Sequence, residues 1–351
     1  MNKDYLNIYA NFLIASSKYA HSTDLQKITE DRYSKDKIYR FLSSGEFCEK
    51  NFWLTIKPIL KSIQNNNACI SVDDTIIEKP HTKENDVVSY CYDHTKSKCV
   101  KGVNLLSVTY KTSEASLPIN YRVIRKNKIS TDHDTNKTKK KSALTKNQHF
   151  RNMLKTIKGN KIKYRYVLAD SWFSSNENFK YIHNDLDKCF VFAVRSNRLF
   201  KFTGEDDSQY RKLSSFDFLP ETAYAIEFKG VSFPLYLSKQ VFKNEDGKEA
   251  VLHLVTNDEY LSYDNMVKIY QKRWDIEVYH KSLKQNCSLG KSSVRTVKTI
   301  LGHIFCSIYA YVLLEKLKLK KKQNQFKLST TYYLMGLEKT FKSLSLDLKS
   351  A

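Results

Sequence analysis

The sequence predicts a mixed α/β (α+β) protein. Apolar residues recur at helical spacing in the first 65 residues and again after about residue 257, whereas alternating apolar residues predict strands in between. A hydrophobic fraction of 41% over 351 residues is enough for a sizeable core and excludes wholesale disorder. The length is that of roughly two domains of 100–200 residues.

The first 65 residues are predicted to be helical and basic. Tyr5, Ile8 and Phe12 fall at helical spacing, as do Phe52 and Ile56, and lysines and arginines lie between such positions. We interpret residues 1–65 as a DNA-binding region, although no helix-turn-helix is recognisable in it. The alternative is a helical cap that only packs against the rest of the chain.

Strands are predicted next, and two of them end in a carboxylate. In residues 68–75 (ACISVDDT), apolar side chains alternate with others up to Asp73 and Asp74. The apolar residues 166–169 are followed directly by Asp170. Further strands are expected at residues 102–110, 117–124 and 190–194. A lysine-rich stretch at 136–163 ends in a helical pattern, and residues 197–257 are expected to form a β-rich insertion.

The rest of the chain is predicted to be helical over 257–284 and 291–318. Within the second segment, residues 299–314 are apolar but fall short of the roughly 20 residues that cross a membrane, so a buried core helix is expected. The predicted division is a helical region (1–65), a core (66–196 and 258–318), an insertion within the core (197–257) and a basic helical tail (319–351).

The charge balance indicates a polyanionic partner. Lysine and arginine number 59 against 37 acidic residues, which gives a net charge of +22. Nucleic acid and an anionic membrane surface both fit this excess. No export signal is visible, and the seven scattered cysteines show no CxxC or Cys/His zinc spacing, so reduced thiols in a cytoplasm are expected.

The segment from Tyr270 to Lys284, YQKRWDIEVYHKSLK, carries the most specific pattern. In one continuous helix, Tyr270, Arg273, Glu277 and Lys284 would share a narrow face about 21 Å long. A carboxylate there suits a cation, and the Arg, Lys and Tyr suit phosphate oxygens. The alternative is a solvated helix with ordinary ion pairs between Asp275 or Glu277 and Lys281.

Asp74, Asp170 and Glu277, with Tyr-x2-Arg-x3-Glu-x6-Lys around the glutamate, resemble the DDE transposases of bacterial insertion sequences. The spacing is similar to that of the insertion-sequence-four-like group, and the resemblance covers roughly residues 66–315. It implies an RNase H-like fold, with a mixed sheet flanked by helices, and two Mg²⁺ or Mn²⁺ ions per active site held by Asp74, Asp170 and Glu277. Carboxylates are also the hard oxygen ligands that these ions prefer.

The resemblance further implies cut-and-paste transposition by a dimer on DNA, acting on terminal inverted repeats and target DNA, with excision commonly through a hairpin. Tyr270, Arg273 and Lys284 would then position the DNA phosphate, with Lys281 as an unassigned neighbour. A cytoplasmic, nucleoid-associated prokaryotic protein is expected. Because the tail after about residue 315 is short, no large C-terminal dimerisation domain is expected. A non-catalytic (decayed or domesticated) DNA-binding protein and an RNase H-like nuclease without strand transfer are the rival functions.

Some residues remain open between a site role and a structural one. Asp73 and Asp74 point to opposite faces of a strand, and Asp74 is preferred because it keeps the parity of Ile70 and Val72 and directly precedes a threonine. Trp172 and Trp274 could stack on a base or pack in the core. The remaining candidates are Arg195 and Arg198, which could touch DNA backbone or be solvated, and His280, for which a satisfied helix histidine is preferred to a metal ligand.

Overall fold

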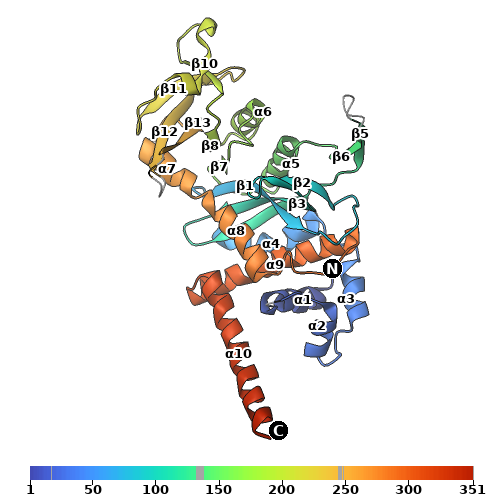
Figure 1. Ribbon diagram of the computed structural model, residues 1–351. Helices are drawn as coiled ribbons and strands as arrows, with labels where there is room; N and C mark the ends of the chain where they lie inside the picture. The colour runs from blue at the N-terminus through green and yellow to red at the C-terminus, as the bar shows by residue number, and fades with distance from the viewer. Residues whose placement is uncertain (17, 132–137, 244–246, 248, 351) are drawn as a thin grey trace.

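The computed structural model describes residues 1–16, 18–131, 138–243, 247 and 249–350. Four of the predicted segments therefore include residues that lie outside these ranges: the helical region 1–65, the lysine-rich stretch, the insertion 197–257 and the C-terminal tail. Figure 1 shows a central sheet with helices on both sides, a group of strands (β9–β13) at one end and a long C-terminal helix at the other.

Four helices form the N-terminal part of the chain. Their apolar faces point inwards, as the sequence periodicity predicts: Tyr9, Phe52 and Ile56 are at most 1% exposed. They pack mainly against the long helix α9 and strand β4. Their bounds are α1 (Lys3–Ala15), α2 (Ser22–Ile28), α3 (Lys35–Leu42) and α4 (Glu49–Ile63).

The centre of the sheet has the strand order β4-β3-β1-β7-β8. Strand β1 pairs antiparallel with β3 and parallel with β7, which in turn pairs parallel with β8, so the sheet is mixed. The predicted mixed sheet flanked by helices is thus confirmed. The strands are β1 (Cys69–Glu78), β3 (Lys98–Lys111), β4 (Ser116–Val123), β7 (Tyr166–Ala169) and β8 (Cys189–Val194).

Strands after residue 198 extend this sheet at the β8 edge. The last of them, β13, pairs antiparallel with β8, and the others follow outwards in the order β12, β11, β9 and β10. They therefore continue the central sheet and do not form a second one. Their bounds are β9 (Leu199–Phe202), β10 (Arg211–Lys212), β11 (Ala223–Phe228), β12 (Leu235–Lys243) and β13 (Glu249–Thr256).

Two further β-hairpins are found away from the β8 edge of the sheet. Strand β2 (Ser89–Asp93) pairs with the start of β3. Strands β5 (Lys128–Thr131) and β6 (Thr138–Lys141) form a separate two-stranded sheet. Strand β6 lies in the lysine-rich stretch, where the sequence indicated only a helix in the second half, and β5 lies just before that stretch. That helix is α5 (Lys146–Gly159), which begins with a capping box made by Thr145 and Gln148.

The segment expected to be one helix from residue 257 to 284 is two helices. Helix α7 covers Tyr263–Gln271 and α8 covers Trp274–Asn286. Between them the backbone makes i→i−3 hydrogen bonds, from Lys272 to Ile269 and from Arg273 to Tyr270, which tighten the turn. The expectation of one continuous helix was therefore wrong, and Tyr270 lies on a different helix from Glu277.

Helix α9 (Val297–Lys321) runs beneath the sheet and is the core helix expected from its apolar sequence. By length and composition alone it could cross a membrane, but 67% of its most apolar window is buried inside the molecule. It begins six residues later than the predicted segment. Helix α10 (Gln325–Ser350) follows after a short turn at Lys322, whose φ of 52° is left-handed. The short helix α6 (Asn176–Lys180) completes the set in Figure 1.

Gly302 of α9 shows how closely the N-terminal helices approach the core. A Cβ atom at this position would lie 2.3 Å from the carbonyl oxygen of Leu42 and 2.9 Å from a ring carbon of Phe47. Neither the backbone oxygen nor the buried phenylalanine can move away easily. Only glycine fits here, and the contact holds the C-terminal end of α3 against α9.

Candidate active site

The two strand carboxylates expected from the sequence come from neighbouring strands. The first strand does not end at the aspartates as predicted, because β1 continues to Glu78 and Asp73 and Asp74 lie within it. Residue Ser71 of β1 is level with Leu168 of β7, so the same parallel register carries Asp73 level with Asp170, just beyond the end of β7. Side chains of Cys69 and Leu168 pack with α7. Because strand residues alternate, Asp73 shares the face of Cys69 that is covered by α7 and α8.

Asp74 points to the opposite face, towards α5. Both of its carboxylate oxygens lie 2.8 Å from the Nζ of Lys146, the first residue of α5. Its Oδ2 also accepts a hydrogen bond of 2.7 Å from Nδ2 of Asn104 on β3. Neither partner could be predicted from the sequence, since both contacts depend on strand pairing and on the packing of α5.

Asp73 is the most perturbed acid of the group. Burial, reinforced by the charges of Asp74 and Asp170, raises its pKa to about 7, and Arg273 opposes this rise. Its Oδ1 accepts a hydrogen bond of 2.8 Å from the backbone N–H of Asp74. Asp73 therefore interacts electrostatically with the second aspartate and with the arginine of the predicted signature.

Asp170 is close enough to Asp73 and Asp74 to interact with both charges. Burial raises its pKa, while the backbone N–H of Trp172, which donates to Oδ1 at 3.0 Å, and the charge of Arg273 lower it; Asp74 adds a smaller rise. The accepting position is the usual one for an aspartate that starts a turn. Asp170 thus starts a turn and also belongs to the acidic cluster.

Glu277 is held by the arginine of its own signature. An Nη of Arg273 donates to Oε1 at 2.7 Å, and the Arg273 guanidinium also lies 5.4 Å from the centre of the Tyr270 ring. The glutamate side chain is 32% exposed. Burial raises the pKa of Tyr270, and the nearby Arg273 lowers it. Despite the break between α7 and α8, these three signature residues are together beside the aspartates.

The remaining predicted residues of α8 are further from the cluster. Partial desolvation lowers the pKa of Lys284, an effect that Asp93 and Glu78 oppose, so its acidic neighbours are at the far end of β1 and on β2. Lys281 lies over the ring of Phe326 in α10, at 5.6 Å. His280 is buried with its Nδ1 3.9 Å from Asp73, and burial lowers its pKa to about 3, which keeps it neutral.

Trp172 forms an exposed aromatic surface next to the acids. It is 51% exposed, and three side chains surround its ring: Arg195 at 4.9 Å, His94 at 5.2 Å and Lys146 at 5.8 Å. Arg198 instead packs on Phe179 and Phe228 and donates to Ser174 and Asn176, which is a structural role. Trp274 is 63% exposed at the start of α8 and does not pack in the core.

The carboxylates of this cluster are suitable ligands for a divalent metal, although two of them form ion pairs with basic side chains in this structure. Among the residues that the structure covers, no group of three His, Cys, Asp or Glu side chains is arranged as a metal site. Lys146 neutralises Asp74 and Arg273 neutralises Glu277. Burial and repulsion from Asp74 and Asp170 raise the pKa of Asp73; a bound cation would relieve that repulsion, and all donors are hard oxygens.

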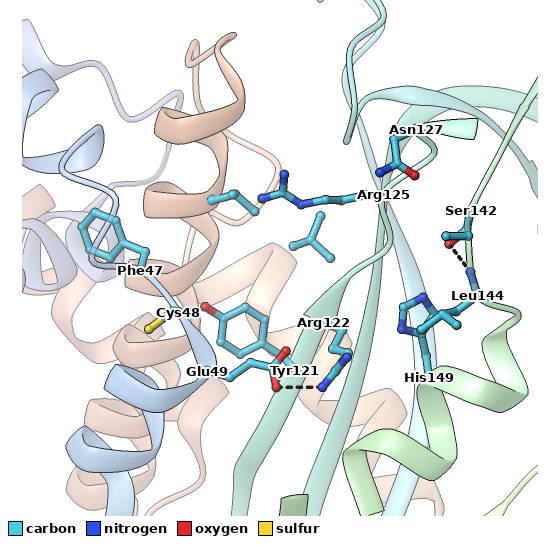
Figure 2. A pocket seen from close by; sticks show the side chains of 13 residues that line it. Phe47, Cys48, Glu49, Tyr121, Arg122, Arg125, Asn127, Ser142, Leu144 and His149 are labelled. Atoms are coloured by element: carbon cyan, nitrogen blue, oxygen red, sulfur yellow. Dashed lines mark hydrogen bonds and ion pairs between the residues drawn. The ribbon is translucent and has the colours of Figure 1, made fainter. Parts of the chain in front are cut away.

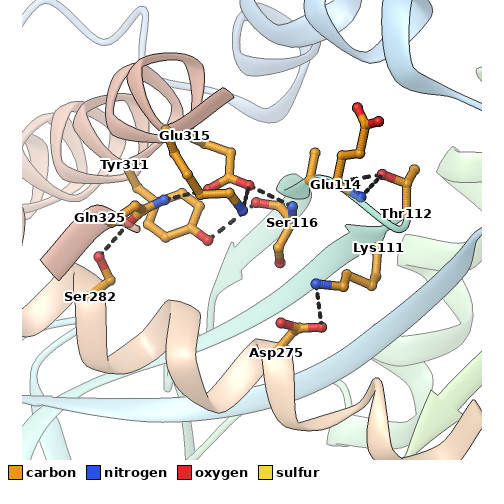
Figure 3. Close-up of polar contacts among 11 residues, drawn as sticks. Lys111, Thr112, Glu114, Ser116, Asp275, Ser282, Tyr311, Glu315 and Gln325 are labelled. Carbon is orange, nitrogen blue, oxygen red and sulfur yellow. Dashed lines mark hydrogen bonds and ion pairs between the residues drawn. The ribbon is translucent and has the colours of Figure 1, made fainter. Parts of the chain in front are cut away.

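A hydrogen-bond network fixes the helix that carries Glu277. Figure 3 shows Ser282 of α8 donating to Oε1 of Gln325 at 2.7 Å, while Gln325 donates to the buried Glu315 at 2.6 Å. Glu315 also accepts from the backbone N–H of Ser116 on β4 at 2.7 Å. A salt bridge of 2.9 Å between Lys111 and Asp275 joins α8 to β3. The sheet, α8, α9 and α10 are thereby held in one arrangement.

A pocket of about 370 Å³ lies away from the acids, between the start of α4, β4 and α5. Figure 2 shows Glu49 paired with Arg122 at 3.1 Å, with Arg125 and His149 nearby. Burial raises the pKa of Glu49, and Arg122 opposes the rise. None of the predicted catalytic residues lines this pocket, so it is separate from the candidate active site.

Comparison with known proteins identifies the family. The model of the DDE superfamily endonucleases matches residues 20–213, which is more than half of the chain. This chain belongs to that superfamily. The matched residues include Asp73, Asp74 and Asp170 and end before Glu277. The mixed sheet flanked by helices is consistent with the RNase H-like fold that the resemblance implies.

One relative is the probable transposase for insertion sequence element IS5377 of Geobacillus stearothermophilus. It is 26% identical over 148 residues, which is 39% of this chain and 38% of the relative. The chain therefore matches less than half the length of that protein. The narrower group indicated by the Tyr-Arg-Glu-Lys spacing stays a prediction.

All seven cysteines are free thiols, as expected from their spacing.

Proposed function

We propose that this protein is a DNA transposase that cleaves the ends of its own insertion sequence and joins them to target DNA by cut-and-paste. The observation that supports this most is the convergence of acids from β1, β7 and α8 with Arg273 and Tyr270, in a member of the DDE endonuclease superfamily. The similarity to a probable insertion-sequence transposase supports the choice of substrate.

We propose that Asp170, Glu277 and an aspartate of β1 hold two Mg²⁺ or Mn²⁺ ions. When bound, such ions would activate a water or a 3′-hydroxyl and stabilise the leaving oxygen. The sequence favours Asp74 as the β1 ligand. The surroundings favour Asp73, because it faces α7 and α8 and interacts with Asp170, whereas Asp74 is paired with Lys146.

The basic and aromatic residues are proposed to hold the DNA. Arg273 and Tyr270 are close enough to the acids to position the scissile phosphate, since a guanidinium binds two phosphate oxygens at once. Lys284 would contact the backbone further along. Trp172, exposed and surrounded by cations, is proposed to stack on a base near the cleaved end.

The test is cleavage of terminal-repeat DNA by the purified chain with Mg²⁺ or Mn²⁺. Wild-type protein should cut the strand at the end of the element, and Glu277→Gln should not. Asp275→Asn is the matched control, because Asp275 is on the same helix and pairs with Lys111 outside the cluster. An absence of metal-dependent cleavage by the wild type, or cleavage that survives Glu277→Gln, would refute the proposal.

Two rival functions have an observation each in their favour. The family description is that of an endonuclease, which fits a nuclease without strand transfer. The closed ion pairs on Asp74 and Glu277 fit a non-catalytic DNA-binding protein. Joining of a 3′-hydroxyl end to target DNA separates the first rival from a transposase, and a gel shift without cleavage would favour the second.

The partners follow from the same proposal. Terminal inverted repeats and target DNA account for the net charge of +22. Two ends have to be brought together, so we propose a dimer on DNA. The site of action would be the bacterial cytoplasm, in association with the nucleoid.

A further inference from the structure

The C-terminal helix α10 extends away from the body of the molecule (Figure 1). Leu328, near its start, is buried to 1% exposure, and Gln325 joins the network around Glu315. Beyond this point the large apolar side chains are uncovered. Those that are about half or more exposed are Tyr333, Leu334, Met335, Leu337, Phe341, Leu344, Leu346 and Leu348.

Most of these side chains form one stripe along the helix. Leu334, Leu337, Phe341, Leu344 and Leu348 follow one another at intervals of 3, 4, 3 and 4 residues. With about 100° per residue, these five and Tyr333 fall within an arc of about 100° over roughly 21 Å. Such spacing is the heptad pattern of a coiled-coil seam. Single exposed apolar residues are ordinary, but a continuous stripe marks an interaction surface.

The charges of α10 lie off this stripe. Glu338 and Lys342 pair with each other at 2.6 Å along the same helix. None of the six stripe residues is charged, whereas the chain as a whole carries +22. Two copies would repel each other over most of their surface, so a charge-free stripe is where they can approach. The neighbouring polar face carries both signs of charge and is not the uniformly basic face of a membrane-surface helix.

We propose that two copies of this chain pair through α10, stripe against stripe, as a short two-stranded coiled coil. The heptad spacing over two repeats fits an identical partner, because the same residues then interlock from both sides about a two-fold axis. This pairing would provide the interface for the dimer on DNA proposed above. The pairing itself does not depend on that proposed function; only the role of the dimer in transposition does. Since α10 points away from strands β9–β13 (Figure 1), pairing leaves that end of the sheet free.

The test is the mass of the full chain in solution without DNA, by sedimentation equilibrium over a range of concentrations. Wild-type protein should be a dimer at micromolar concentration, and Leu337→Asp with Phe341→Asp should raise the dissociation constant at least a hundredfold. Ser343→Asp with Leu346→Asp introduces the same charge on the opposite face of α10 and should leave the dimer largely intact. Far-UV circular dichroism should show the same helix content in all three.

Cross-linking provides a second readout. With the exposed Cys48 and Cys99 replaced by serine, Leu344→Cys should form a disulfide-linked dimer under mild oxidation, and Ser343→Cys should not. A wild-type monomer at all concentrations, including one that binds anionic vesicles through α10, would overturn the proposal. Equal loss of dimer in the stripe and control variants would also overturn it. A dimer without DNA cleavage would leave this inference standing and refute only the proposed function.

Discussion

The candidate active site and the packing around α9 are built on opposite principles. Around α9 the contacts are apolar and close, with Gly302 against the backbone of Leu42 and His303 fully hydrogen-bonded. Within β1 and just beyond β7, three aspartates lie close together, and burial together with neighbouring carboxylates raises the pKa of Asp73 and of Asp170. Packing stabilises the folded chain in the first region. In the second region, neighbouring buried carboxylates destabilise the folded chain but form the proposed metal site. Substitutions in the two regions should therefore affect different measurements.

The largest expected effect is on activity in the acidic cluster. Asp170→Asn should lower DNA cleavage roughly a thousandfold or more, since one of the proposed metal-binding groups is removed. Its unfolding midpoint in urea should be equal to or above that of the wild type, because burial and Asp74 disfavour the ionised form of Asp170. If the variant unfolds at a much lower urea concentration than the wild type, Asp170 contributes to the stability of the fold, as the residues around α9 do.

The opposite result is expected for Gly302→Val. Its side chain would collide with Leu42 and Phe47, so the free energy of unfolding should fall by about 3 kcal/mol. Urea denaturation followed by circular dichroism measures this loss. The substitution Gly336→Val, in the part of α10 where a Cβ meets nothing within 4 Å, is the control and should change stability by much less.

His303 makes the packing region sensitive to acid. Its Nδ1 accepts from the hydroxyl of Tyr9 and its Nε2 donates to the carbonyls of Ser288 and Leu289, and burial lowers its pKa from 6.5 to about 3. Below pH 6.5 the unfolded chain binds a proton that the folded chain does not. Stability should therefore fall between pH 6.5 and 3, by about 1.4 kcal/mol per pH unit.

The measurement is the urea midpoint at pH 7 and pH 5 for the wild type and for His303→Gln. The variant should be less stable at pH 7 and should lose less stability on acidification. An identical pH dependence in the two proteins would show that other groups cause the acid sensitivity.

The smallest expected effect is a gain in stability at Asp73. Because its folded pKa is about 7 and its usual value is 3.8, the stability contributed by its neutral form is present below pH 4 and is lost as the pH rises through 7. Asp73→Asn should therefore stabilise the chain at pH 8 by about 1 kcal/mol or more and much less at pH 4. Asp74→Asn removes the ion pair with Lys146, so this variant is not expected to gain stability at pH 8 as Asp73→Asn does.

The sequence predicted the parts of the site that depend on local pattern. Strand alternation indicated that Asp170 directly follows a buried strand, and fixed spacing connected Tyr270, Arg273 and Glu277. The sequence placed Asp74 on the correct strand but at its end, whereas pairing with β3 extends β1 to Glu78. It did not predict Lys146 or Asn104, which reach Asp74 only through the packing of α5 and the pairing of β3. Parity showed that Asp73 and Asp74 point to opposite faces. Which face α8 covers is a tertiary property, and so is the joining of β13 to β8.

Binding of Mn²⁺ to the full chain, measured by isothermal titration calorimetry at pH 8, tests whether these acids form a metal site. The proposed site predicts that the wild type binds Mn²⁺ and that Asp170→Asn and Glu277→Gln each lose most of this binding, while Asp275→Asn keeps it. The comparison of Asp73→Asn with Asp74→Asn in the same experiment identifies the ligand from β1. Equal binding by the wild type and by Asp170→Asn would contradict the claim that these acids form the metal site.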